Sequence, residues 1–392
     1  MNRNLWLLAL LQGLLLTNNV TFIAINGLVG LALAPFSWMA TLPVMGYVVG
    51  GALFTAPVSW AQGRYGRKGG FALGLAVAFV SALLCAYAAN TRNFWLLCAT
   101  TVLAGYYSAN GQLYRFASIE VAGPTAREKA VSLVMAGGLI GAVIGPNLAS
   151  RTKDLAHAPF VGAYLSLAIV AALALLVLSG MHFPKATGQA VISGGRALGT
   201  IMRQPAFIVA AGGGALSYGV MNLLMAATPL AMQQCGLPFS DAAWVLEWHV
   251  IGMFAPGFFT GYLIQRFGPL PVMGAGVVLN LLCVAIALSG TDLHHFTAAL
   301  FMLGVGWNFL FTASTTLSLS SYEPQERDRA QAAMNFLLFA VMAVSSFSSG
   351  VLVTTQGWTW LNVGSLAPLA LIASALMWLA GRHRTIRSVG PG

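Results

Sequence analysis

The sequence predicts an all-α integral membrane protein of twelve transmembrane helices, arranged as two pseudo-symmetric six-helix bundles. Of its 392 residues, 58% are hydrophobic and only 7% are charged, whereas a soluble domain carries about 25% charged residues. Apolar runs of the roughly 20 residues that cross a bilayer fill almost the whole chain. The two halves also repeat sequence motifs about 200 positions apart. These observations exclude a water-soluble fold.

Polar breaks between the apolar runs divide the chain into predicted spans. The first bundle, 1–181, and the second bundle, 205–381, are joined by a cytoplasmic linker, 182–204, that is rich in Gly and Ser, and a tail follows at 382–392. The predicted helices are 4–31, 36–61, 70–89, 94–121, 130–149, 159–181, 205–232, 241–264, 270–289, 295–321, 331–353 and 359–380.

Basic residues in the loops predict the orientation, because Lys and Arg concentrate in short cytoplasmic loops. With the amino terminus inside, nearly all of the loop Lys and Arg fall on the cytoplasmic side, and only Arg92, Arg151 and Lys153 fall outside. Both termini are therefore predicted to be cytoplasmic. The net charge of +10 is spread singly between apolar runs, so no nucleic-acid partner is predicted.

Two motif pairs show that the halves share one plan. Arg64-Tyr65-Gly66 corresponds to Arg266-Phe267-Gly268, and the segment from Pro124 to Ala130 corresponds to the segment from Pro324 to Ala330. Parallel repeats of this kind relate the two halves of some secondary transporters. At these residues the chain resembles the major facilitator superfamily, over essentially its full length. The resemblance implies the fold of that family and a multi-pass protein of the bacterial inner membrane.

The loop after the second predicted helix carries most of the family's signature G-x-x-x-D-R-x-G-R-R/K. Arg64, Gly66, Arg67 and Lys68 match it, but Gly63 replaces the acid. The resemblance implies a gating role for these four residues and for Arg266 in the second repeat. Without the acid, the basic side chains are expected to meet helix carboxyl ends, which carry partial negative charge.

The fifth predicted helix contains the pattern G-x-x-x-G-P, formed by Gly141, Gly145 and Pro146. In the family this pattern marks proton-coupled exporters, which implies a conformational role for these residues. The alternative interpretation is a seam of small residues for close helix packing. Thr101 stands where such exporters carry an Arg in the fourth helix, and this departure counts against export.

Ionisable residues inside the predicted spans are candidates for proton coupling, because charges within a bilayer are costly and usually functional. They are Glu247 and His249 in the eighth helix and Arg115 and Glu120 in the fourth. Glu247 and His249 point in different directions on their helix and cannot share a partner. The alternative is that Glu247 and His249 are interfacial polar residues close to Trp244 and Trp248.

Polar and aromatic residues of four helices are candidates for the wall of a central substrate cavity. Amides recur along one face of the first helix, and aromatic residues next to amides occupy corresponding positions of the fourth and tenth helices. Interhelical hydrogen bonding and ordinary packing are the alternatives. The candidates are Asn19, Asn26, Tyr107, Asn110, Tyr218, Asn222, Trp307 and Asn308.

The predicted function is secondary active transport of a small organic solute, neutral or amphiphilic, by alternating access and coupled to protons. Export is favoured, and uptake of a nutrient or vitamin-like molecule is the alternative. No GxxxxGK[ST] loop for ATP is present. An intramembrane enzyme is the rival from another class, but it would need clustered catalytic groups. We expect no enzyme activity, cofactor or metal, and a monomer whose partners are the substrate, protons and lipid.

Overall fold

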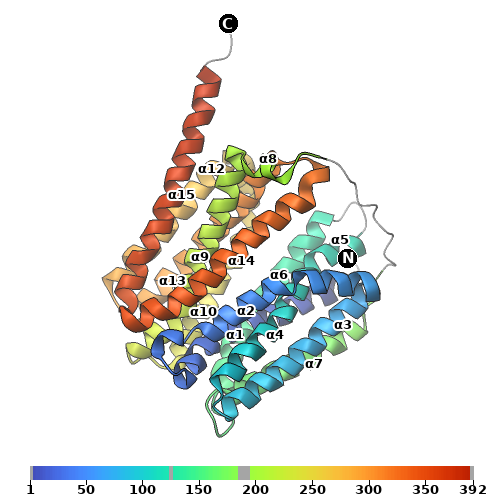
Figure 1. The fold of residues 1–392 in the computed structure, drawn as a ribbon, viewed down its shortest axis with the longest axis vertical. Coiled ribbons are helices and arrows are strands. Elements are labelled where there is room, and N and C mark those ends of the chain that lie inside the picture. The colour runs from blue at the N-terminus through green and yellow to red at the C-terminus, as the bar shows by residue number, and fades with distance from the viewer. Residues whose placement is uncertain (1–2, 123–126, 184–194, 389–392) are drawn as a thin grey trace.

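The computed structural model describes residues 3–122, 127–183 and 195–388, and it folds into two helical bundles side by side (Figure 1). The first bundle comprises α1 (Arg3–Leu33), α2 (Leu42–Leu53), α3 (Thr55–Asn90), α4 (Phe94–Gly111), α5 (Tyr114–Val121), α6 (Arg127–Thr152) and α7 (Val161–Ser179). The second comprises α8 (Leu198–Met202), α9 (Pro205–Gln234), α10 (Phe239–Phe254), α11 (Gly257–Phe267), α12 (Pro269–Ser289), α13 (Leu293–Ser318), α14 (Arg327–Thr355) and α15 (Gly357–Ser388).

Within the described ranges, nine helices are long and apolar enough to cross a membrane. Three predicted spans, 36–61, 94–121 and 241–264, are instead interrupted. The first becomes a short 3-10 turn, α2 and the start of α3, the second becomes α4 and α5, and the third becomes α10 and α11. Pro256 lies at the break between α10 and α11, where proline cannot donate a helical hydrogen bond.

The end of the second predicted helix and the whole of the third form the single element α3, which is broken inside by Gly66. Gly66 has φ 71° and ψ 175°, and Gly268, its counterpart between α11 and α12, has φ 83° and ψ 165°. Positive φ of this kind suits glycine, which has no Cβ. The repeat read from the sequence therefore extends to the backbone conformation of the turn.

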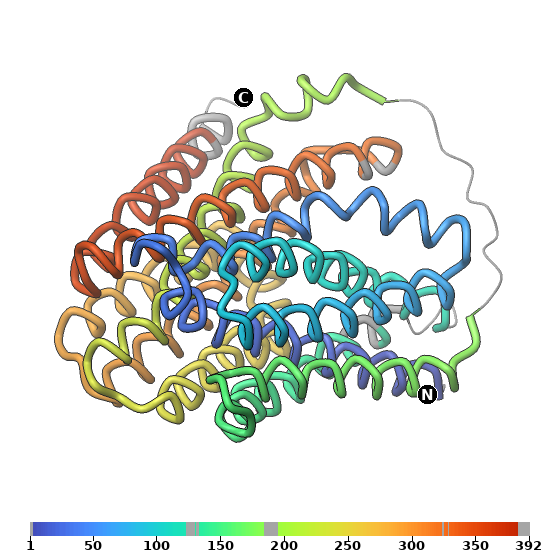
Figure 2. The backbone as a smooth tube through the Cα atoms, turned by 60° about the horizontal axis from the view of Figure 1, so that its bottom comes forward, coloured from blue at the N-terminus to red at the C-terminus, as the bar shows by residue number. Residues whose placement is uncertain are grey.

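The linker and the tail depart from their predicted limits. Helix α8 forms inside the predicted linker and packs against α14 at one end of the second bundle (Figure 2). Residues 184–194 of the linker and 124–126 of the repeated segment lie outside the described residues. The predicted tail at 382–392 begins within α15, which continues to Ser388.

Helices α1 and α6 cross at small residues. A Cβ on Gly137 would lie 2.0 Å from the Ala9 carbonyl oxygen, and one on Gly141 would lie 2.5 Å from that of Gly13. Any side chain at either position would push the two backbones apart. In the G-x-x-x-G-P pattern itself, a Cβ on Gly145 would also lie 3.0 Å from the Thr17 carbonyl oxygen, so its two glycines make the close helix packing that the alternative to the exporter interpretation describes.

Candidate functional site

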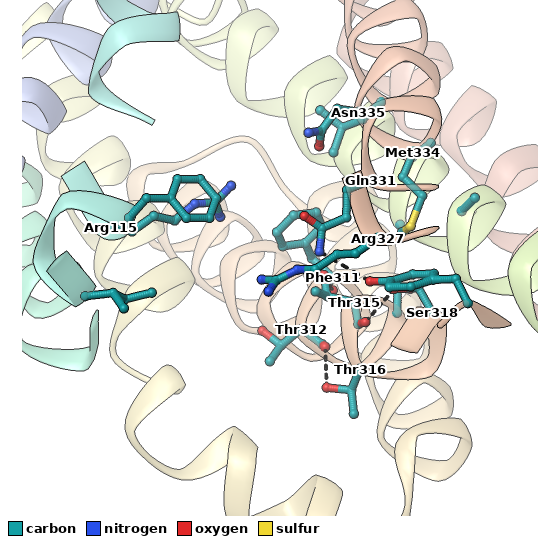
Figure 3. A pocket seen from close by; sticks show the side chains of 18 residues that line it. Arg115, Phe311, Thr312, Thr315, Thr316, Ser318, Arg327, Gln331, Met334 and Asn335 are labelled. Carbon is teal, nitrogen blue, oxygen red and sulfur yellow. Dashed lines mark hydrogen bonds between the residues drawn. The ribbon is translucent and has the colours of Figure 1, made fainter. Parts of the chain in front are cut away.

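A cavity of about 450 Å³ lies between the two halves. Arg115, Phe116 and Ile119 of α5 form its wall on the side of the first half, and α9, α13 and α14 form the wall opposite (Figure 3). Its size is in the range of pockets that bind small organic ligands. The remaining lining residues are Ala211, Gly214, Ala215, Phe311, Thr312, Ser314, Thr315, Thr316, Ser318, Tyr322, Arg327, Gln331, Met334, Asn335 and Leu338.

The cavity combines hydroxyl, amide and apolar side chains with two cations, Arg115 and Arg327. Among the described residues that line it, no side chain is a carboxylate. A cation entering this space would meet two positive charges without a counter-charge. The lining therefore favours a neutral or electron-rich solute over a cationic one.

Aromatic rings back the cavity in the second half. Phe311 of α13 lines the cavity and stacks on Trp307, with 5.2 Å between ring centroids and 8° between ring planes. Tyr218 of α9 meets both rings edge-on, at 5.0 Å and 5.1 Å. Offset stacking and edge-to-face contacts hold such a cluster together. It brings two predicted cavity residues, Tyr218 and Trp307, next to the cavity wall.

On the opposite side of the molecule the two halves are joined by hydrogen bonds. The amide nitrogen of Asn147 in α6 donates to the carboxylate of Glu247 in α10 at 2.6 Å. Thr41, before α2, donates from Oγ1 to the carbonyl oxygen of Ser346 in α14 at 2.6 Å and accepts from the Gly350 amide at 3.0 Å. We call these three hydrogen bonds and the residues that make them the closed contact.

Glu247 and His249 point to different partners, as their spacing predicts. The carboxylate of Glu247 faces the first half in the closed contact, whereas His249 is buried within the second half. The His249 Nδ1 lies 2.7 Å from the carbonyl oxygen of Leu300 in α13, which sets Nδ1 as the protonated nitrogen because a carbonyl can only accept. His249 therefore connects α10 to α13 and does not line the cavity.

Arg115 and Glu120 are also separated. Arg115 lines the cavity, whereas the carboxylate of Glu120 accepts from Arg67 Nε at 2.9 Å. Lys68 donates to the carbonyl oxygens of Ser179 and Met181, at 2.7 Å and 2.9 Å. Lys68 thus binds a helix carboxyl end, as we expected of the signature's basic residues. All of these bonds stay within the first half.

Arg64 of the signature and Arg266 of its repeat both lie at the surface of the protein. The side chain of Arg64 is exposed. Arg266 donates to the Tyr262 hydroxyl at 3.1 Å, and its guanidinium carbon lies 5.4 Å from the centre of the Phe267 ring. Neither side chain lines the cavity, so a gating role for them stays a prediction.

Amides of the first bundle are used for packing between helices. The hydroxyl of Tyr47 donates to Asn19, and that of Tyr164 donates to Asn26. Asn110 donates to the Gly70 carbonyl oxygen in α3 at 2.7 Å. Tyr107 is buried in the apolar core of the first bundle. None of the four first-bundle candidates lines the cavity in this conformation, because each faces a neighbouring helix.

The two amide candidates of the second bundle behave alike. Asn222 donates to the hydroxyls of Ser345 and Ser346 in α14, at 2.9 Å and 2.7 Å. Asn308 accepts from the Thr260 hydroxyl and donates to the Met253 carbonyl oxygen, each at 2.7 Å. Both side chains are thus bonded to neighbouring helices inside the bundle, where buried amides need such partners.

Sequence reasoning missed most of the cavity wall. Thr312, Thr315 and Thr316 follow one another along α13, and Gln331 and Asn335 are four residues apart on α14. Such spacing places polar side chains on one helix face. A search for polar stripes in the tenth and eleventh predicted spans would have found them.

An ion pair anchors the start of the second bundle near the cavity. The Arg196 guanidinium donates to Glu326 from Nε at 2.9 Å and from Nη2 at 2.7 Å, and its backbone amide adds a bond at 2.6 Å. Together with the bond from the Glu323 amide, these contacts lower the pKa of Glu326 to about 2 and raise that of Arg196. The carboxylate is wholly buried, so its charge depends on this pair.

Comparisons with known proteins agree with this architecture. The family model described as Major Facilitator Superfamily matches residues 210–391, and that described as Sugar (and other) transporter matches residues 32–187. A riboflavin transporter of Brucella anthropi, RfnT, is 38% identical over 363 residues, which cover 92% of this chain and 91% of RfnT. The chain belongs to the major facilitator superfamily. It is accordingly a multi-pass secondary transporter and not an enzyme.

Other relatives and solved structures place the transporter in the same fold. An uncharacterised transporter of Bacillus subtilis, YddS, is 25% identical over 87% of this chain and 82% of its own length. A mutant of the nucleoside transporter NupG superposes with a TM-score of 0.77 at 14% identity, over 96% of this chain and 99% of that mutant chain. An inward-facing bacterial homologue of the lysosomal transporter Spinster gives 0.71 at 15% identity, over 96% of each chain.

Proposed function

We propose that this transporter takes up riboflavin, or a closely related flavin, by alternating access. The similarity to RfnT over nearly the whole length of both chains carries the choice of substrate. The cavity supports it, because riboflavin joins a flat aromatic ring system to a chain of hydroxyl groups. Stacked aromatic residues behind Phe311 suit the ring, and the threonine and amide side chains suit the hydroxyls.

Uptake replaces export as the favoured direction. The exporter interpretation depended on the G-x-x-x-G-P pattern, and its glycines are accounted for by the close crossing of α1 and α6. A cavity lined by two arginines and no carboxylate among its described residues is also ill suited to cationic drugs. Export of a flavin is the second candidate, and the direction of net flux separates the two.

Proton coupling belongs to the same proposal, with Glu247 as the coupling residue. Its carboxylate is half-buried and accepts a hydrogen bond from the other half of the molecule. A charged acceptor makes a stronger hydrogen bond than a neutral one. Protonation of Glu247 would therefore weaken the closed contact and favour its opening. In this scheme proton binding on the closed side permits entry of the solute from that side.

Growth of a riboflavin-requiring bacterium that lacks a flavin importer tests the proposal. Expression of the chain should restore growth at riboflavin concentrations that do not support the parent strain. Cells that carry the protein in their membrane and still fail to grow would contradict riboflavin uptake. Loss of flavin from a strain that synthesises it would instead support export.

A further inference from the structure

Arg115 lies on the cavity wall that the first half supplies. Helix α4 ends at Gly111 and α5 starts at Tyr114. Because of this break, Arg115 is the second residue of a separate helix. Figure 3 shows its side chain reaching into the space opposite Phe311, Gln331 and Arg327. The first half thus contributes one cation to a wall that is otherwise apolar, beside Phe116 and Ile119.

The guanidinium of Arg115 makes no side-chain hydrogen bond or ion pair within the described part of the chain. Its Nε is buried without a hydrogen-bond partner. The nearby carboxylate of Glu120 is held by Arg67. The guanidinium carbon lies 4.9 Å from the centre of the Phe116 ring, so an aromatic face supports it from one side.

A half-buried cation without a counter-charge is costly, and within a membrane protein it marks a functional site. The missing acceptor must come from a ligand or from solvent in the cavity. A guanidinium is planar and presents its donors in a fixed fork that matches two acceptors lying in one plane. Adjacent ring nitrogen and carbonyl oxygen atoms of a flat heterocycle offer such a pair, while separate hydroxyls on a flexible chain do not.

We infer that Arg115 is the specificity-determining residue that reads the acceptor edge of the flavin's dione ring. The inference rests on the proposed function and adds the orientation of the substrate in the cavity. The carbonyl edge of the ring lies on Arg115 at the first-half wall, and the ring reaches across the cavity to rest on Phe311. The hydroxyl chain points to the opposite wall, where Thr312, Thr315 and Gln331 offer hydroxyl and amide partners.

Binding to the purified full-length transporter, followed by quenching of flavin fluorescence, tests this orientation with two probes. Riboflavin carries both the ring and the hydroxyl chain, whereas lumiflavin carries the ring alone. Arg115→Gln should weaken binding of both probes by the same factor, about 10- to 100-fold, since hydrogen bonds from a charged donor are lost. Gln331→Ala should weaken riboflavin by about 3- to 10-fold and leave lumiflavin unchanged.

Two further variants control for charge and for geometry. Arg203→Gln removes the same charge from an exposed position that does not line the cavity, and it should bind both probes like the wild type. Arg115→Lys keeps the charge but loses the planar fork, and it should recover little of the loss. Size-exclusion profiles and melting temperatures show whether each variant is folded. If Arg115→Gln is not folded, Arg115→Lys takes its place in the binding test.

The outcomes separate the inference from the proposed function. If the wild type binds riboflavin and Arg115→Gln binds both probes as tightly as the wild type does, the inference is wrong and the proposed function stands. A loss for riboflavin alone would place Arg115 on the hydroxyl chain and overturn the orientation. Full recovery of binding with Arg115→Lys would show that the positive charge is enough and that the planar fork of the guanidinium is not needed. A wild type that binds neither probe contradicts the proposed function, and the inference falls with it.

Discussion

The two ends of the interface between the halves are held in opposite ways. In the closed contact, hydrogen bonds from Asn147 and Thr41 cross from the first half to the second. At the cavity end, the ion pairs Arg67–Glu120 and Arg196–Glu326 each stay within one half. The chain therefore joins its halves by polar bonds at one end and braces each half separately at the other.

This difference indicates which end of the interface between the halves opens at the lower cost in free energy. Within the described residues, opening the cavity end breaks none of the ion pairs, because each brace moves with its own half as a unit. Opening the closed contact must break several hydrogen bonds, which contribute about 0.5–1.5 kcal/mol each, and more for a charged acceptor. The loop charges predict that the cavity end is cytoplasmic, and in that orientation the cavity would face inwards.

The largest expected effect comes from wedging the closed contact apart at Gly350. A Cβ at this position would lie 2.3 Å from Thr41 Oγ1 and 3.0 Å from the Thr41 backbone nitrogen. Gly350→Leu should disfavour closure by about 1–3 kcal/mol and so lower uptake about 10- to 100-fold. A cysteine replacing Leu230, which is buried where α9 meets α1, should then react faster with maleimide.

A matched control for this variant is available in α15. Gly364 is exposed, and the nearest atom to a Cβ there is 3.9 Å away. Gly364→Leu should leave both uptake and the maleimide reaction as in the wild type. If Gly350→Leu transports normally, the closed contact does not form during transport as described.

The next effect concerns proton coupling. Glu247→Gln keeps a neutral hydrogen bond to Asn147 but cannot take up a proton, so uptake should lose its dependence on a pH gradient. We also expect the rate of uptake to fall by about fivefold, which corresponds to the difference in free energy between a charged and a neutral hydrogen bond. Proteoliposomes with an imposed gradient provide the measurement.

Asn147→Ala separates coupling from simple weakening of the contact. It removes the hydrogen-bond donor but keeps the carboxylate of Glu247. This variant should therefore transport more slowly and still respond to the gradient. If Glu247→Gln responds to the gradient as the wild type does, Glu247 is not the coupling residue.

A smaller effect is expected at the aromatic wall. Phe311→Leu keeps the wall apolar but removes the ring that stacks on Trp307. Aromatic pairs contribute about 0.5–1.5 kcal/mol beyond their buried area, so riboflavin affinity should fall by about 2- to 10-fold. Titration of flavin fluorescence measures it. Unchanged affinity would mean that the flavin ring does not rest on this wall.

The smallest effect on transport is expected from Glu326→Gln, because this brace lies within one half. The variant should transport normally and melt at a lower temperature at neutral pH. Since the folded pKa of Glu326 is lowered to about 2, the carboxylate stabilises the fold above its ordinary pKa and loses this contribution as the pH falls towards 2. The difference in melting temperature between the wild type and Glu326→Gln should therefore shrink as the pH is lowered from 7 to 3. A constant difference would contradict the ionised pair.

Much of the fold could be predicted from the sequence because it depends on composition and spacing. The apolar runs, the two halves and the turn at Gly66 and Gly268 follow from hydropathy and from a repeated motif. The interruptions at residues 54, 112–113 and 255–256 could not be placed, because a run stays apolar on both sides of a break. Whether the two helical segments form one continuous helix or are separated by a break depends on the helices that pack against them.

The site was predicted less well, for a physical reason. An amide in an apolar helix, such as Asn222 or Asn308, can either face a cavity or bond to an adjacent helix, and the sequence does not contain the partner. Both found partners within the second bundle. Arg115 was identified because a cation has fewer ways to be satisfied in an apolar setting. The threonines of α13 escaped notice because they are common in ordinary membrane helices.

Riboflavin counterflow tests whether the chain carries riboflavin by alternating access, because counterflow requires a binding site that opens to each side in turn and needs no coupling ion. Proteoliposomes holding the purified chain are loaded with unlabelled riboflavin and diluted into a trace of labelled riboflavin. We expect transient accumulation of label above the external concentration, absent from protein-free vesicles and reduced in Gly350→Leu. Wild-type protein that is correctly inserted but shows no accumulation would contradict riboflavin transport by this chain.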